Sequence, residues 1–250
     1  IDNDKNEALC GWIDALAEVA IKAIDRTTPS LAIQAIDELQ TIADHFLAAS
    51  KSMGQPMDDS AIKSGQPDHL SYTLFYLFQR MELINEKALE QRLEPVCSRL
   101  ITALGKVAIA AAKIDLSLVS YPLYYMGKFA SRGQKERMND ISDKAVCAFI
   151  EVSREIILNT NLQYQELKEP FFSLIGHIES IVKETFRQDK TTSIKLLIQP
   201  FEELKALFQS ERVVSHQDTP LILIDINRVI NEFNELDLIL RTIPPLSTPV

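Results

Sequence analysis

The sequence predicts an all-α protein, an irregular stack of antiparallel helical hairpins of the α-solenoid or helical-bundle kind. About nine helices are expected in a single domain over residues 1–250. Three observations predict this fold. Apolar residues recur at three- and four-residue spacing along most of the chain, which is the period of a helix buried on one side. Only 7 glycines occur, which is few for a sheet protein with many tight turns. Prolines and short polar segments separate the periodic stretches.

The first two helices are predicted within residues 9–47, where they form a hairpin. The first helix carries an apolar stripe of Leu9, Ile13, Leu16, Ala20 and Ile24, with Trp12, Val19 and Ala23 beside it. Proline disfavours α geometry in the residue before it and suits the first position of a helix, so Thr28 and Pro29 mark the boundary between the helices. Because the joint is short, the two helices are expected to be antiparallel neighbours.

Residues 50–71 show no periodicity and contain two glycines and two prolines, which predicts a long loop that trypsin cuts first at Lys51 or Lys63. Seven further helices are predicted: 70–92, 95–114, 115–130, a helix from about 142 to 158, one ending near 186, one ending near 209, and 221–240. A turn is expected at 131–133, a second loop at 210–220, and a Pro-rich tail at 243–250. A strand stays open as an alternative at 221–226.

Charge and cysteine content narrow the function classes. A net charge of −9 and a pI of about 5.0 argue against nucleic acid or an anionic membrane surface as a partner. The three cysteines, Cys10, Cys97 and Cys147, are widely spaced and odd in number, which predicts reduced thiols and a cytoplasmic location. No secretory signal or transmembrane span is apparent, since the longest uncharged apolar run, 116–127, is too short.

No motif in the chain indicates catalysis. The four histidines are far apart and lack metal-site spacing, so no metal is expected. Dinucleotide-binding, phosphate-loop and nucleophile-elbow motifs are absent, so no cofactor is expected and an enzyme is disfavoured. Glu166, Glu169, Glu179 and Glu184 could offer inward carboxylates, but nothing marks them as a metal-binding set and solvated helix faces are the favoured explanation.

Two aromatic clusters are the candidate site. They consist of Tyr72, Phe75 and Tyr76 at the start of one helix and Tyr121, Tyr124 and Tyr125 at the start of another. Core packing with hydroxyl groups at the rim would explain them. The functional alternative is an apolar groove for a partner helix or a small ligand.

The first hairpin also resembles a motif of a bacterial family of predicted membrane proteins of unknown function. Residues 16–24, LAEVAIKAI, and residues 32–39, AIQAIDEL, carry this resemblance, whereas the turn at 25–30 is shorter than the double-proline turn of that family. Proteins of the family join transmembrane helices to a soluble helical region. The resemblance covers some thirty residues and implies no activity. It does imply an anchor at the inner membrane in a segment absent from this chain.

These observations predict a non-catalytic helical interaction or scaffold domain that binds a protein, and they leave a homo-oligomer open. The alternative is a helical enzyme or ligand-binding protein with a pocket near the aromatic clusters. Residues 15–23 are similar to residues 103–111, which leaves open whether the hairpins are true repeats.

Overall fold

The computed structural model describes residues 3–52, 69–159, 162, 166–189 and 193–242. These residues form nine α-helices and one 3-10 helix and contain no strand, which confirms the all-α prediction. The elements are α1 (Asn3–Asp25), α2 (Pro29–Ser52), α4 (His69–Glu90), α5 (Glu94–Ala112), η1 (Leu116–Val119), α6 (Ser120–Lys135), α7 (Asn139–Asn159), α8 (Lys168–Gln188), α9 (Ile194–Phe208) and α10 (Thr219–Thr242). Most of the predicted 50–71 loop and the tail at 243–250 lie outside the described residues.

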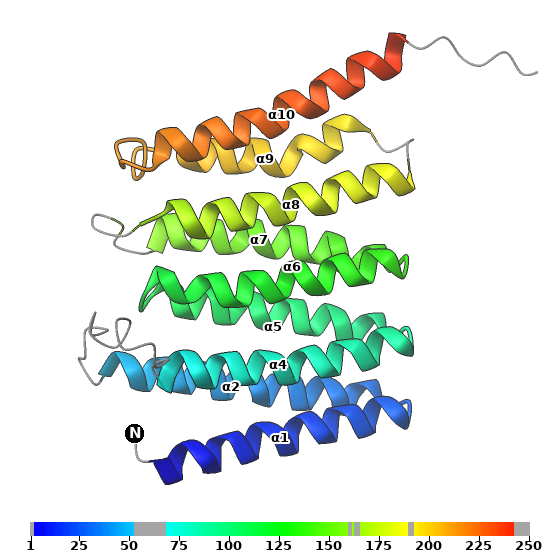
Figure 1. The fold of residues 1–250 in the computed structure, drawn as a ribbon, viewed down its shortest axis with the longest axis vertical. Coiled ribbons are helices and arrows are strands. Elements are labelled where there is room, and N and C mark those ends of the chain that lie inside the picture. Colours follow the sequence, from blue (N-terminus) through cyan, green and yellow to red (C-terminus); the bar gives the residue numbers. More distant parts are fainter. Residues whose placement is uncertain (1–2, 53–68, 160–161, 163–165, 190–192, 243–250) are drawn as a thin grey trace, which may run out of the picture.

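The helices alternate between two layers (Figure 1). Layer A contains α1, α4, α6, α8 and α10, and layer B contains α2, α5, α7 and α9. Within each layer, successive helices pack side by side, and each also packs against helices of the other layer. Since every helix contacts only near neighbours in the stack, the molecule is an α-solenoid rather than a closed bundle.

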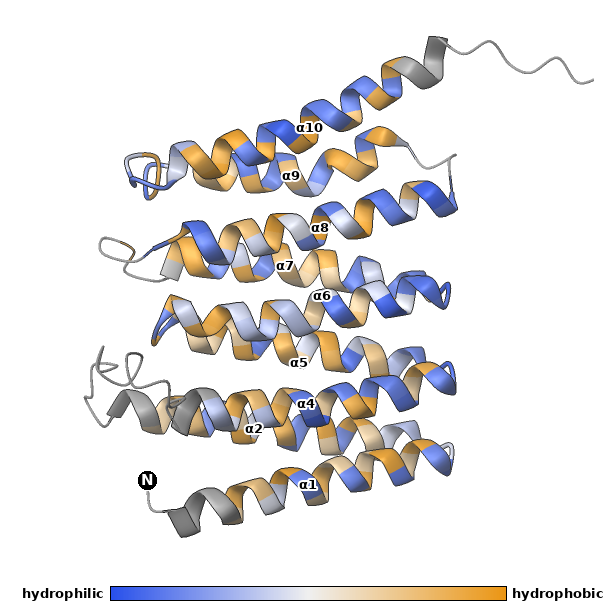
Figure 2. Ribbon diagram, viewed as in Figure 1, coloured by the Kyte–Doolittle hydropathy of each residue, from blue (hydrophilic) through white to orange (hydrophobic). Residues whose placement is uncertain are grey.

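The core lies between the layers, and polar and apolar residues alternate along the helices accordingly (Figure 2). Among its fully buried side chains are Ile36, Leu100, Phe129, Phe149 and Phe201. In the described part of the chain, α5 is the one helix long and apolar enough to cross a membrane. Here it packs against α2, α4, α6 and α7, as the core helix of a solenoid does.

Three hairpins turn in the same way. The backbone N–H groups of Thr28, Leu93 and Met138 each donate a hydrogen bond to the carbonyl oxygen five residues earlier. In each turn, the N–H group of the residue just before donates to the carbonyl oxygen three residues earlier. This is the Schellman motif, which needs a left-handed residue after the helix. Thr27, Arg92 and Arg137 occupy that position with φ of 52°, 55° and 60°. The shared turn indicates that α1–α2, α4–α5 and α6–α7 are structurally equivalent units.

The structure corrects two details of the sequence-based reading. The turn expected at 131–133 does not exist, because α6 continues to Lys135. Gly133 serves packing instead: a Cβ atom there would lie 3.0 Å from the side chain of Ile141 on α7. Residues 221–226 are helical, which excludes the strand alternative. In α1 the buried face is centred on Ile13, Ala17, Ala20 and Ile24.

Candidate partner-binding surface

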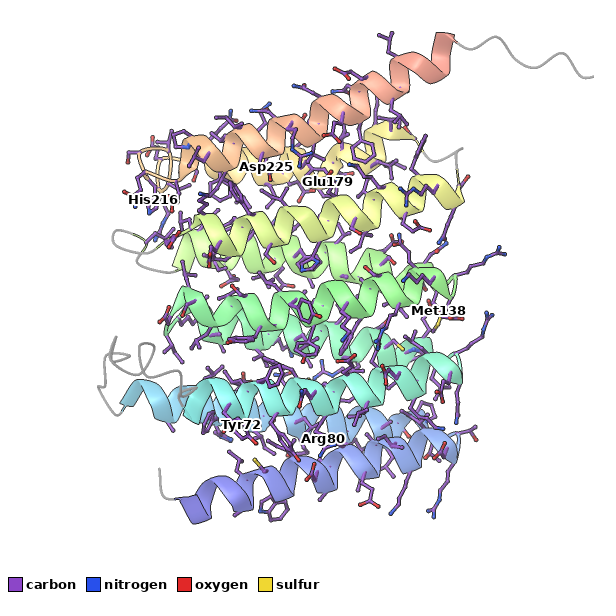
Figure 3. The ribbon with its side chains drawn as sticks, viewed as in Figure 1. Tyr72, Arg80, Met138, Glu179, His216 and Asp225 are labelled. Atoms are coloured by element: carbon purple, nitrogen blue, oxygen red, sulfur yellow. The ribbon has the colours of Figure 1, made fainter. Side chains whose placement is uncertain are left out.

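Four of the six candidate aromatic residues lie on the outer face of layer A, the face turned away from layer B. Tyr72 and Phe75 come from the first two turns of α4, and Tyr121 and Tyr124 come from the first turns of α6. Their side chains are between 38% and 51% exposed. Figure 3 shows Tyr72 near the end of α4 where the chain enters that helix. We call these four residues the aromatic surface.

The register between α4 and α6 brings the two clusters together. Glu82 contacts Lys128 at 2.6 Å, and Glu86 contacts Arg132 at 2.5 Å, so residues 46 apart in sequence face one another. The same offset places Phe75 opposite Tyr121. The aromatic surface therefore spans two adjacent parallel helices.

The other two candidate residues, Tyr125 and Tyr76, are not part of the aromatic surface, because their side chains pack against other residues of the fold. Tyr125 is 4% exposed, and its ring packs 5.6 Å from that of Phe78. Burial, with a smaller contribution from Glu82, raises the pKa of the Tyr125 phenol. Tyr76 turns toward α1, where its hydroxyl donates to Asp14 at 2.7 Å and accepts a hydrogen bond from Arg80 at 2.7 Å.

Ion pairs hold three of the four seams between layer-A helices. Arg80 pairs with Asp14 across α1 and α4, and Lys128 and Arg132 pair with Glu82 and Glu86 across α4 and α6. Across α8 and α10, Arg228 pairs with Glu179 and Lys183 pairs with Glu232. Arg228 also lowers the pKa of the Glu179 carboxyl. These ion pairs link neighbouring helices of layer A.

The fourth seam, between α6 and α8, carries a cavity of about 370 Å3. It is lined by Ser131, Gln134, Lys135, Gly176, Glu179, Ser180, Lys183, Glu184 and Arg187. A Cβ atom on Gly176 would meet no atom within 4 Å, so nothing packs against Gly176 and the cavity is open to solvent there. Gln134 joins the two helices below it by donating to the carbonyl of Ile181 at 2.7 Å and to the Thr185 hydroxyl at 2.8 Å. The site could accept a small polar ligand.

Sequence reasoning missed this cavity because its walls come from segments some 45 residues apart. The sequence predicts a turn at 131–133, whereas the structure places Ser131 inside α6, four residues before its end. The small residues Ser131, Gly176 and Ser180 were its one local signal.

His177 of α8 packs tightly against Gly127 of α6. A Cβ atom on Gly127 of α6 would lie 2.2 Å from the His177 Nδ1 atom. The imidazole stacks on Phe149 with the ring centroids 5.8 Å apart, and burial lowers the pKa of His177. Within the described ranges, no three His, Cys, Asp or Glu side chains gather as they would around a metal ion.

Comparison with known proteins indicates no family. No family model matches the chain, and no curated protein sequence matches it significantly. Similar solved structures include a "circular tandem repeat protein with novel repeat topology and enhanced subunit contact surfaces", at 15% identity and a TM-score of 0.34 over 92% of this chain. The chain spans 59% of the length of that protein.

A second similar structure comes from "Computational Design of Self-Assembling Cyclic Protein Homooligomers". It is 13% identical, with a TM-score of 0.36 over 92% of this chain and 99% of the other. At these TM-scores, the likeness indicates nothing about function.

Proposed function

We propose that this chain is a non-catalytic helical scaffold that binds a protein partner through the aromatic surface. The observation that carries the proposal is the exposure of four aromatic side chains on two adjacent helices. Tyrosine combines a rigid apolar ring with a polar tip, so it is enriched where proteins bind one another. Lys128 lies 5.8 Å from the ring centroid of Tyr124 and pairs with Glu82, so it adds a polar group at the edge of the surface.

Site-specific photo-crosslinking in the source cell tests this proposal. A photoreactive phenylalanine analogue in place of Tyr124 or Tyr72 should give one discrete heavier adduct, whose partner mass spectrometry can identify. The matched control is the same analogue in place of Glu151, an exposed residue of α7 in layer B. No adduct at either tyrosine, or the same adducts at all three positions, would contradict the proposal.

A second candidate function is binding of a small polar ligand, which the cavity between α6 and α8 favours. In the described part of the chain, Lys135 forms no ion pair or hydrogen bond, and the Arg187 guanidinium is held only by Glu184 at 3.3 Å. Thermal unfolding against a metabolite library tests this function, because a ligand that binds only the folded state raises Tm in a saturable way. A saturable shift that Lys135→Ala abolishes would favour this second function over the scaffold.

A reducing, cytoplasmic location belongs to the same proposal. Cys97 is fully buried, and Cys10, Cys97 and Cys147 are all free thiols. Attachment to an inner membrane through a segment absent from this chain is proposed on the resemblance of the first hairpin alone. Fractionation of the source cell, followed by detection of the native protein in soluble and membrane fractions, tests both statements.

A further inference from the structure

One edge of α1 is apolar and exposed at the end of the stack. Trp12 is 68% exposed and Val19 is 42% exposed, while Leu9 and Leu16 beside them are partly buried. At about 100° per residue, Trp12 and Val19 lie about 160° and 140° around the helix from Asp14. Asp14 faces α4, so these two side chains point away from the rest of the stack.

The stripe from Trp12 to Val19 carries no charge. Lys22 lies one turn beyond Val19 at the border of this edge and pairs with Glu18 at 2.6 Å. Leu31 in the first turn of α2, next to the C-terminal end of α1, is also exposed. Trp12, Val19 and Leu31 therefore make the end of the stack apolar where a solvated helix would be polar.

The opposite end of the stack differs. The exposed arc of α10 carries Leu221, Ile224 and Leu238, but Asn231, Asn234 and Glu235 lie between Ile224 and Leu238. A head-to-tail contact would bury these polar groups against the apolar edge of α1 without partners, which is costly. The edge of α1 is complementary to itself, which is the requirement of a two-fold interface.

We propose that a second copy of this chain packs on the α1 edge, so that the protein forms a two-fold dimer through antiparallel α1 helices. With the axis between Ala15 and Leu16, Trp12 of each copy lies on Val19 of the other. The residues at the axis, Ala15 and Leu16, are apolar. No charged side chain therefore faces the same side chain of the other copy. The contact continues onto α2 through Leu31.

The available area suits a dimer. The helices α1 and α2 have 23 and 24 residues, which makes each about 35 Å long and about 10 Å wide. Together their outward faces offer at most about 700 Å2, including the exposed polar residues Gln34 and Glu38 beside Leu31. Each partner contributes roughly 800 Å2 to a standard interface. Interfaces of this size reach at least micromolar affinity when they contain a good aromatic anchor.

Trp12 is the one tryptophan of the chain, so its fluorescence reports on the proposed interface directly. Light scattering after gel filtration should give a mass of twice 28.2 kDa at high concentration. On dilution, the mass should fall and the tryptophan emission should shift to the red with the same midpoint. Val19→Glu keeps the fluorophore and should be monomeric, with red-shifted emission at every concentration.

Ile224→Glu is the matched control, since Ile224 is 65% exposed on α10 and lies outside the proposed interface. It should dimerise as the parent chain does, and circular dichroism should show both variants folded. The proposal is overturned if the parent chain stays monomeric up to about 1 mM, because a dimer with a dissociation constant above that value has negligible affinity. A dimer that Val19→Glu leaves intact or that Ile224→Glu dissociates also overturns it. A blue shift of Trp12 with lipid vesicles and no dimer would identify a membrane as the occupant instead.

Discussion

Replacing Asn85 with leucine should stabilise the protein. Asn85 is fully buried in α4, and neither its amide nitrogen nor its amide oxygen has a hydrogen-bond partner. One turn away on the same face are Met81 and Leu89, which also belong to the core. The native state therefore contains a desolvated amide that water satisfies in the unfolded chain.

The size of the effect follows from that loss. A buried polar group left without partners costs about 1–3 kcal/mol. Leucine has the same branching of side-chain heavy atoms, although it is bulkier, and it removes this cost and has a somewhat better helix propensity than asparagine. A misfit in the core would subtract up to about 1.5 kcal/mol. We expect a net gain of between about 0 and 3 kcal/mol, which raises Tm by about 2–4 °C per kcal/mol for a chain of this size.

Gln134→Leu is the control for this prediction. Gln134 is also a buried amide, but its nitrogen donates to Ile181 and Thr185. Its replacement should destabilise the protein by about 1–3 kcal/mol, because two hydrogen bonds are lost at about 0.5–1.5 kcal/mol each. The Thr185 hydroxyl still donates to the Ile181 carbonyl at 3.0 Å. Urea unfolding followed by circular dichroism measures both variants. If Asn85→Leu lowers the urea midpoint as Gln134→Leu does, the Asn85 amide has a partner in solution and the reasoning is refuted.

Three further predictions concern residues near the helix contacts. Gly127→Ala should destabilise the protein by about 1–3 kcal/mol, since the new methyl group collides with His177. Adding His177→Ala to Gly127→Ala should recover part of the lost stability in the same urea assay. If the free-energy changes of the two substitutions simply add, the side chain at 127 does not collide with His177. Because burial lowers the pKa of His177 below 6.5, stability should be full above pH 6.5 and fall as the pH drops below it, since the unfolded chain then binds a proton that the native state resists. His177→Gln should flatten this slope, and an unchanged slope would assign it elsewhere. Burial raises the pKa of Cys97 to about 12, so iodoacetamide should label the exposed Cys147 first and Cys97 only on unfolding, as peptide mass spectrometry can check. Equal labelling rates would show that Cys97 is accessible.

Local signals made most of the helices predictable. Pro29 begins α2, and Pro95 lies in the first turn of α5 as its sequence position suggested, because proline acts on its own backbone and on that of its neighbour. Arg92 and Arg137 gave no such signal. They hold left-handed turn positions in which glycine is the usual residue, so neither turn could be located to the residue in advance.

The candidate site was less predictable, because neighbouring helices decide which way a side chain faces. Tyr72 and Tyr76 are one turn apart on α4, yet Tyr72 is exposed and Tyr76 bonds to Asp14 of α1. Sequence spacing groups the two residues, whereas the position of α1 separates their environments. The cavity between α6 and α8 depends in the same way on which two helices become neighbours.

The shared Schellman turns determine where this chain can accept inserted residues. Three hairpins close with the same tight turn at one rim of the stack, where an inserted residue would break the 6→1 hydrogen bond. At the other rim, the links between hairpins differ: η1 joins α5 to α6, and consecutive turns over 209–218 join α9 to α10. Insertions and fused domains should therefore leave the fold intact at that rim and destabilise it at the other. Tyr72 and Tyr121 lie beside the tolerant rim, so new segments added there would extend the aromatic surface without disturbing the stack.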